Sequence, residues 1–451
     1  MEPLFSNSFP TADKRAWLAQ VQKELKNELT YENLYWHTEE GFTMEPYYTA
    51  DDLAASGIHK TLTISQDSQK QVPGWLNAPH RRISDEKTDN LHLRDALTRG
   101  ADALVVSLPA QTDLSRLLNG IKLSQTPVYF RINEPATAAD FLQSLKTVAP
   151  YQLKGGLLME AGGTTAEATR LTTDSPLFRT ICGSSHAFHN AGANATQELA
   201  FTLASLADTY DQLTNEGLTI DQLIPKTLLS ISIGTSYFLE IAKLRALRVL
   251  LKRFGSAYSP MVSHQASFIH CQTSTFYDAT ATPYTNLLRA TTEAMAAVIG
   301  GCDVLTVHPY DTVLGNPPGS SALSATDHDF ADRIARNVSV LLKEESYLDK
   351  VADPSAGSYY IETLTSHLVD TTWTLFLDVE KRGGFARALA DGFVHQEIAR
   401  AYQAKLDAVR TGKVLVGVTR FRFDEPSIQT HKVSKNHMGL LADRRLAGEF
   451  E

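Results

Sequence analysis

The sequence predicts an α/β protein built on a (β/α)8 TIM barrel, with an N-terminal arm before the barrel and covering helices after it. Between about residues 73 and 307, short β-branched runs alternate with stretches of helical period, which is typical of parallel βαβ units. Eight such units over about 270 residues match the number and size of a (β/α)8 barrel. A doubly wound open sheet is the alternative arrangement.

The predicted strands are short and rich in Val, Ile and Leu. In chain order they cover residues 72–75, 103–108, 127–132, 156–159, 178–182, 228–233, 261–267 and 303–307. The clearest helices between them cover 136–148, 197–211, 237–254 and 285–299. In 237–254, apolar residues repeat at helical spacing, the later turns are basic, and Gly255 follows as a predicted C-cap.

Three segments are expected along the chain: an arm over 1–70, the barrel over 71–345 and a C-terminal helical extension over 346–451. The arm is expected to begin with a helix capped by Thr11 and to continue in an aromatic-rich stretch, which must pack on its own barrel or on a partner. Long helices are predicted over 361–410, followed by a short strand at 414–418.

Small polar residues lie on one face of two predicted strands. Ser230 and Ser232 alternate with aliphatic residues, and Ser263, Gln265 and Ser267 share one face of the next strand. Buried parallel strands are normally apolar on both faces. The pattern favours a barrel with room and hydrogen-bonding groups inside. The alternatives are that these serines satisfy each other or ordered water, or that the strand faces are assigned wrongly.

Composition excludes several classes of protein. The 42 Lys and Arg residues against 51 Asp and Glu residues give a net charge of −9, which offers no basis for binding nucleic acid or an anionic membrane. No apolar run approaches the roughly 20 residues of a membrane span, and the N-terminus lacks a signal-peptide core. Cys182, Cys271 and Cys302 are expected to be buried, reduced thiols. The protein is therefore expected to be cytoplasmic.

The residues alone indicate no reaction. Dinucleotide-binding, P-loop, nucleophile-elbow and His-Glu-x-x-His motifs are all missing. His186 and His189 lie three apart, a spacing that metal ligands use on helices, but no third ligand is evident and no metal is expected.

Four stretches of the chain together carry a family resemblance. They are Trp36-His-Thr-Glu-Glu-Gly-Phe with its sequel to Leu53, the helical run from Ser236 to Ala246 preceded by Ala191-Gly-Ala, His270-Cys-Gln-Thr-Ser with the helix that follows it, and Arg333-Ile-Ala-Arg-Asn with Asp353 to Glu362. The chain resembles the adenosylcobalamin-dependent methylmalonyl-CoA mutase family from about residue 30 to 420. The resemblance implies a barrel whose polar interior takes the pantetheine arm of coenzyme A, and a separate domain that holds cobalamin through a histidine.

The sequence departs from the catalytic pattern of that family. His186 and Ala187 stand where active subunits carry a Tyr-His pair, so the donor to the substrate carbonyl is missing. Phe268 stands where active subunits carry an arginine that can clamp the substrate carboxylate, and a phenyl ring cannot make that contact. No Asp-x-His occurs, and the chain ends at Glu451, so no cobalamin domain is expected. His270, Gln272 and Ser274 persist as pocket positions, serving either packing or residual ligand binding.

The resemblance therefore implies a small, non-catalytic subunit that forms a heterodimer with a large catalytic subunit, within an isomerase that interconverts methylmalonyl-CoA and succinyl-CoA. This chain alone is expected to be inactive, with a degenerate site and no catalytic residues. Adenosylcobalamin is expected in the partner. An isolated chain is expected to form a homodimer if its arm aromatics are exposed. The alternatives are an independent acyl-CoA mutase barrel served by a separate cobalamin-binding protein, and an acyl-CoA-binding regulatory module.

Overall fold

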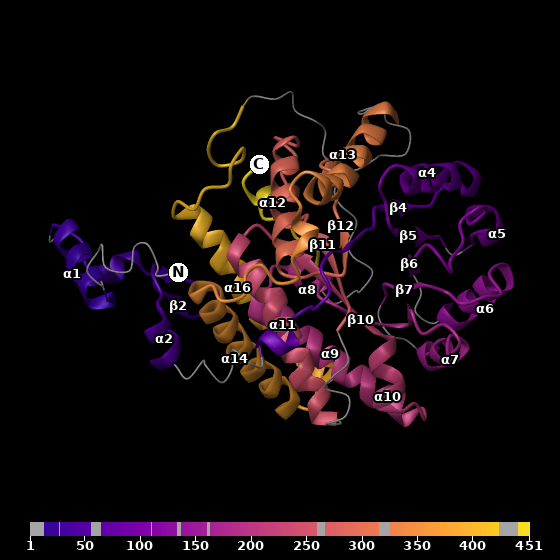
Figure 1. Cartoon of the computed structure of the whole chain (residues 1–451), viewed down its shortest axis with the longest axis horizontal. Coiled ribbons are helices and arrows are strands. Elements are labelled where there is room, and N and C mark those ends of the chain that lie inside the picture. Colours follow the sequence, from indigo (N-terminus) through magenta and orange to yellow (C-terminus); the bar gives the residue numbers. More distant parts are fainter. Residues whose placement is uncertain are drawn as a thin grey trace, which may run out of the picture.

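The computed structural model describes residues 13–26, 28–55, 65–109, 111–132, 137–159, 163–258, 267–314, 325–423 and 441–451. Two five-stranded parallel sheets form its centre, and helices pack around them (Figure 1). This confirms the predicted α/β class with alternating strands and helices.

The first sheet has the order β4-β5-β6-β7-β8 and follows the chain. Its strands are β4 (His80–Arg82), β5 (Leu104–Leu108), β6 (Val128–Ile132), β7 (Gly155–Leu157) and β8 (Phe178–Arg179). Helices α4 (Glu86–Thr98), α5 (Leu114–Leu117), α6 (Ala138–Val148) and α7 (Thr165–Leu171) alternate with the strands and lie along one side of the sheet (Figure 1).

The second sheet has the order β3-β12-β11-β10-β9. Its strands are β3 (Leu76–Asn77), β9 (Ile181–Ser184), β10 (Thr227–Ile233), β11 (Ile269–Thr273) and β12 (Val304–Thr306). The helices between these strands are α8 (His186–Ala191), α9 (Ala195–Asn215), α10 (Ile220–Leu223), α11 (Tyr237–Tyr258) and α12 (Thr285–Ile299), and α13 (Ala325–Glu344) follows β12.

Two continuous chain segments, 76–82 and 178–184, belong to both sheets. In the first, Ala78 donates its amide proton to the Leu305 carbonyl at 2.9 Å, and the Asn77 carbonyl accepts from Ala103 at 3.1 Å. In the second, Thr180 donates to Lys226 at 3.0 Å, and β8 pairs with β7. At each of these two segments, the backbone hydrogen bonds of one sheet therefore continue into the other sheet.

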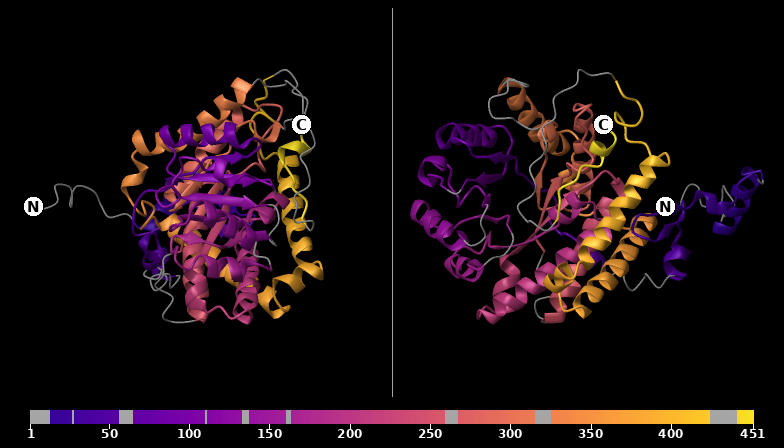
Figure 2. Two further views of the ribbon diagram at one scale, coloured as in Figure 1. Left: turned by 90° about the vertical axis from the view of Figure 1, so that its right-hand side faces the viewer. Right: turned by 180° about the vertical axis from the view of Figure 1, so that it is seen from behind.

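The ends of the chain add an arm and a layer of helices. The arm holds α1 (Lys14–Glu24), α2 (Ala50–Ala55), a 3-10 turn (Tyr31–Leu34) and the antiparallel pair β1 (Trp36–His37) and β2 (Thr43–Met44). Helix α1 stands away from the body in two views, whereas α2 lies against α14 (Figures 1 and 2). Helices α14 (Tyr359–Lys381), α15 (Phe385–Ala390) and α16 (Phe393–Arg410) cover the side of the body formed by α9 and α11.

Several predicted boundaries need correction. The described strand between β10 and β12 is β11, and residues 261–266 of the strand predicted at 261–267 lie outside the described residues. The strand predicted at 72–75 begins later, at Leu76, because Trp75 is instead a buried side chain whose indole donates to Ser339 at 2.7 Å. Residues 414–418 form a turn with one bridge between Val416 and Arg420.

Two predicted helix ends also change. Helix α11 continues past Gly255 to Tyr258, since Phe254 and Tyr258 both pack on Tyr210. The Asp13 carboxylate caps α1 by accepting from Ala16 at 2.8 Å, and Thr11 lies outside the described residues. Within the described part of the chain, no helix has the length and apolar character that crossing a membrane requires.

A fully buried arginine joins α11 to the C-terminal helices. Arg245 forms ion pairs with Asp353 and, at 2.7 Å, with Glu362 near the start of α14. The Gly357 amide also donates to Glu362 at 3.0 Å. The stretch from Asp353 to Glu362 therefore has a structural role, because it neutralises a buried cation. It belongs to one of the four stretches that carry the family resemblance.

We predict that Arg245→Met lowers the free energy of unfolding by about 3–5 kcal/mol, because it leaves two carboxylates without their buried cation. Urea denaturation measures this loss. The matched control is Arg410→Met, which removes an exposed pair with Asp407 at 3.2 Å and should change stability by less than about 1 kcal/mol. Equal effects of the two substitutions would contradict this account of the interface.

Candidate functional site: a polar cavity at the carboxyl ends of the strands

A cavity of about 880 Å³ opens at the carboxyl ends of the central strands. Its wall includes His80 from β4, Arg131 from β6, Gln272 from β11, His186 at the start of α8 and His308 just after β12. Ligand sites of parallel α/β proteins occur at this end of the strands. The cavity is therefore the candidate functional site.

Hydrogen bonds join His186, in the wall of this cavity, to Ser230, Ser232 and His270, which are buried behind it. His186 Nδ1 lies 2.7 Å from the Ser232 hydroxyl and its Nε2 lies 2.7 Å from the Ser230 hydroxyl. His270 Nδ1 lies 2.7 Å from the same Ser230 oxygen, and its Nε2 lies 2.9 Å from Thr306 Oγ1. The serines of 228–233 thus form a polar inner face, as expected from the sequence, while Ser263 and Gln265 lie outside the described residues.

When both imidazoles are neutral, the protons in this chain have one consistent arrangement. Thr306 donates its only hydroxyl proton to the Ala78 carbonyl at 2.8 Å, so it must accept from His270 Nε2. His270 Nδ1 then accepts from Ser230, and Ser230 accepts from His186 Nε2. His186 Nδ1 finally accepts from Ser232. Each ring in this arrangement donates from Nε2 and accepts at Nδ1.

The electrostatics of the cavity agree with neutral imidazoles. Burial, aided by the positive charge of Arg131, holds the pKa of His186 and of His270 well below the usual value. The same two causes lower the pKa of His308 to about 3. Burial also lowers the pKa of Arg131, to about 10, so its guanidinium stays protonated at neutral pH. The Arg131 guanidinium therefore stands among neutral rings, and Arg81 and Arg82 line the same cavity.

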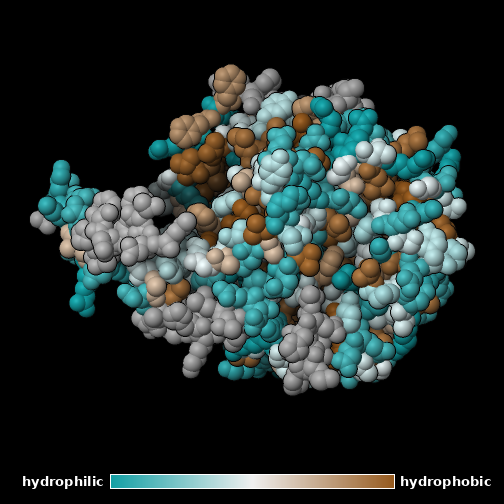
Figure 3. Space-filling model, in the orientation of Figure 1, coloured by the Kyte–Doolittle hydropathy of each residue, from teal (hydrophilic) through white to brown (hydrophobic). Residues whose placement is uncertain are grey.

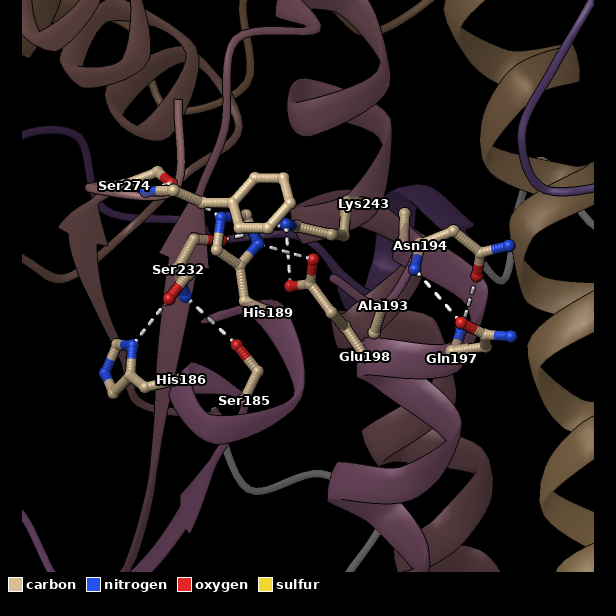
Figure 4. A network of polar contacts seen from close by, with 12 residues as sticks. Ser185, His186, His189, Ala193, Asn194, Gln197, Glu198, Ser232, Lys243 and Ser274 are labelled. Carbon is tan, nitrogen blue, oxygen red and sulfur yellow. Dashed lines mark hydrogen bonds and ion pairs between the residues drawn. The ribbon is translucent and has the colours of Figure 1, made fainter. Parts of the chain in front are cut away.

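A second, fully buried network lies beside the first (Figure 4). His189 Nδ1 contacts Glu198 at 2.6 Å, and its Nε2 contacts the Ser274 hydroxyl at 2.6 Å. The Lys243 ammonium lies 3.1 Å from Glu198 and 2.6 Å from Glu240, and it donates to the Ser232 carbonyl at 2.8 Å. Burial would raise the pKa of Glu198, but Lys243 and His189 outweigh it and hold that pKa below its usual value.

The site residues predicted from the sequence lie in different places in the structure. His186 and Gln272 line the cavity, His270 stands behind His186 in the proton chain, and Ser274 belongs to the second network. Ala187 is buried on α8 and has only a methyl group to offer. Phe268 lies before the start of β11, stacked on Tyr129 and covered by the Arg179 guanidinium 3.7 Å from its ring centre.

Sequence reasoning did not select Arg131, His80 or His308 as site residues. Arg131 lies near the carboxyl end of β6 and His308 just beyond that of β12, and those positions were the available signal, whereas His80 is the first residue of β4. Both ring nitrogens of His186 are hydrogen-bonded to serine hydroxyls. Those of His189 are hydrogen-bonded to a carboxylate and to a serine hydroxyl. Across the described ranges, no group of His, Cys, Asp and Glu has the arrangement of a metal site.

Comparison with known proteins gives consistent matches. Residues 138–447 match the profile of the family described as Methylmalonyl-CoA mutase. The methylmalonyl-CoA mutase small subunit of Porphyromonas gingivalis is 31% identical, with 93% of this chain and 71% of that protein covered. The small subunit of Streptomyces virginiae is 30% identical, with 92% and 71% covered. The methylmalonyl-CoA mutase of Cereibacter sphaeroides is 28% identical, and this chain spans 65% of its length.

We predict that His308→Asn makes the protein less sensitive to acid. The folded pKa of His308, about 3, lies below the usual value near 6.5, so the neutral ring stabilises the fold above pH 6.5 and this contribution is lost as the pH falls below it. Between pH 7.0 and 5.5, the variant should lose about 1 kcal/mol less unfolding free energy than the wild type. Urea denaturation at both values measures the difference, and parallel losses would contradict a buried neutral ring.

Proposed function

Since this chain belongs to the methylmalonyl-CoA mutase family, we propose that it is a small, non-catalytic subunit that binds a large catalytic mutase subunit. The observation that supports this proposal is the similarity of the chain to two proteins named as mutase small subunits. The identity is 30% or more, over more than nine tenths of the chain. In this proposal the partner performs the interconversion of methylmalonyl-CoA and succinyl-CoA.

We further propose that the two sheets are halves of one closed (β/α)8 barrel over residues 71–345. The two shared segments support this proposal, because their hydrogen bonds continue both sheets in a ring of eight strand segments. Residues 1–70 would then be the arm, and residues 346–451 the helical extension. A closed barrel places the 880 Å³ cavity at its carboxyl mouth, where such folds bind ligands.

Two pocket positions support a partner role over turnover by this chain. The methyl group of Ala187 cannot donate a hydrogen bond to a substrate carbonyl. Phe268 is held by Tyr129 and Arg179, outside the lining of the cavity. His186, His189 and His270 use both ring nitrogens in bonds to protein groups, so they do not fit as cobalt ligands. We therefore assign adenosylcobalamin to the partner.

The arm is the proposed contact surface. Lys14 holds its tip together through Asp52 at 2.6 Å and Glu45 at 2.9 Å, and Glu39 ties its base to Lys413 at 2.7 Å. Trp36 and Tyr47 remain 39% and 43% exposed. Figure 3 shows the arm standing out from the body into solvent. An ordered projection with exposed aromatics fits a surface that a partner covers.

Three buried free thiols, at Cys182, Cys271 and Cys302, support a reducing compartment. We propose that the complex is cytoplasmic.

The test is co-expression of this chain with the large catalytic subunit of the same organism. We expect the two to co-purify as a heterodimer, and we expect the double variant Trp36→Ala, Tyr47→Ala to weaken the complex by about tenfold or more, since buried aromatics dominate interface energies. The dissociation constant is measured by surface plasmon resonance.

The matched control is Tyr151→Ala, which removes a 39% exposed tyrosine from the loop after α6, on the far side of the body from the arm (Figure 1). It should leave binding unchanged. Failure of the two chains to co-purify would exclude the proposed role. Turnover of an acyl-CoA by this chain with a separate cobalamin-binding protein would replace it with an independent mutase.

A further inference from the structure

The segment that follows α16 carries an exposed apolar surface. Residues 411–423 leave the end of α16, and Phe421 and Phe423 are 79% and 77% exposed. These are the highest values among the large hydrophobic residues that the structure describes. Figure 3 shows hydrophobic side chains gathered over this segment, at the upper left of the molecule. Exposed apolar side chains that gather in one place mark contact surfaces.

The first turns of α12 extend this surface. The Arg289 guanidinium donates to the Val416 carbonyl at 2.7 Å, and the Thr282 hydroxyl donates to the Gly417 carbonyl at 3.1 Å. Exposed residues of α12 therefore lie beside those of the segment. Together they form what we call the apolar patch, which consists of Tyr284, Leu288, Val414, Val416, Phe421 and Phe423.

The patch stands on a fixed base. Leu415 and Val418 are buried and belong to one core cluster with Phe276. Gly417 has φ +76°, and a Cβ atom at this position would lie 2.4 Å from Thr282 Oγ1, so the turn requires glycine. Because the segment is anchored on its inner side, little conformational entropy remains to be lost when a partner covers its outer side.

The backbone of Phe421 is unusual for an exposed aromatic residue. Its φ of 57° lies in the left-handed region, which bulky side chains rarely adopt. Burial of the ring in the free chain does not offset this strain, since the ring is exposed. Strained residues that a fold retains cluster at functional sites. The conformation therefore supports a role for Phe421 in contacts outside this chain.

The charges of the segment indicate what kind of surface fits it. Lys413, Arg420 and Arg422 are the charged residues of 411–423, and all three are exposed. The segment is thus cationic in a chain whose net charge is −9. Phenylalanine and arginine are both enriched in protein–protein interfaces. A complementary surface combines apolar side chains with carboxylates.

The patch is continuous with the arm. Glu39, at the base of the arm, forms an ion pair at 2.7 Å with Lys413 of the segment and lies 3.6 Å from Lys405 of α16. The arm and the segment also stand on the same side of the body in two views (Figures 1 and 2). A protein that covers the aromatics of the arm is therefore placed beside the patch.

We propose that the apolar patch is a second contact site for the large catalytic subunit, which presents an apolar and acidic surface to it. This inference rests on the proposed function, because the arm determines which partner lies beside the patch. A second copy of this chain fits less well. In a two-fold dimer the same patch meets itself, which would bring Arg420 and Arg422 of both copies into one interface.

The test measures binding of the full chain to the large subunit of the same organism by surface plasmon resonance. We expect the double variant Phe421→Asn, Phe423→Asn to raise the dissociation constant at least tenfold, since buried aromatics dominate interface energies. Asparagine tolerates the left-handed conformation, so the melting temperature of the isolated variant should be equal or higher.

A second variant tests the charge of the patch. Arg420→Glu, Arg422→Glu should also weaken the complex, and the difference from the wild type should shrink as the ionic strength rises, because salt screens exposed charges. Weakening that does not depend on salt would contradict an acidic partner surface.

The matched control is Tyr347→Asn. Tyr347 is 63% exposed and has a φ of 54°, so it resembles Phe421 in both respects. It follows α13 near the amino ends of the strands, where Asp349 lies beside Gly74, just before β3. The patch instead adjoins the start of α12, so the control should leave the dissociation constant unchanged.

The outcomes separate this inference from the function on which it rests. If the wild-type chain does not bind the large subunit, the proposed function fails and the inference fails with it. If Trp36→Ala, Tyr47→Ala weakens the complex and the Phe421 and Phe423 double variant does not, only the patch is excluded. Loss of self-association in sedimentation, with unchanged affinity for the large subunit, would assign the patch to a second copy and overturn the proposal. A large drop in the melting temperature of the double variant would assign both rings to packing and also overturn it.

Discussion

Helix α11 carries two buried cations that fix the surrounding elements. Lys243 reaches Glu198 of α9 and the Ser232 carbonyl of β10, while Arg245 reaches Asp353 and Glu362 before and within α14. A buried charge is tolerated only when its partners are in place. The positions of α9, β10, α11 and α14 therefore depend on one another, and the frame of the protein assembles around these ion pairs.

This frame also determines the shape of the cavity wall. Lys243 holds the Ser232 carbonyl, Ser185 accepts from the Ser232 amide at 3.0 Å, and the Ser232 hydroxyl donates to His186. The ionic network and the proton chain thus meet at one residue of β10. The proposed loss of chemistry at Ala187 and Phe268 is compatible with an intact frame, because neither side chain contributes a polar contact to either network.

Sequence reasoning succeeded where the signal was local. The helix over 285–299 was predicted to the residue, and the polar face of 228–233 followed from simple alternation. Strand β11 was missed because His270 and Gln272 interrupt its apolar pattern, although both are polar for a reason: they face the interior. Arg131 was missed because its partner Gln272 lies 141 residues away, and only the folded sheets bring the two together.

The central claim is that this chain contributes a frame and a binding surface while its partner performs the reaction. The most direct test is turnover of methylmalonyl-CoA by the reconstituted complex after the cobalt-ligating histidine of the large subunit is replaced by alanine. Our account predicts that turnover falls to background, because no second active site remains in this chain. Residual turnover that responds to substitutions at Arg131 or His186 of this chain would contradict it.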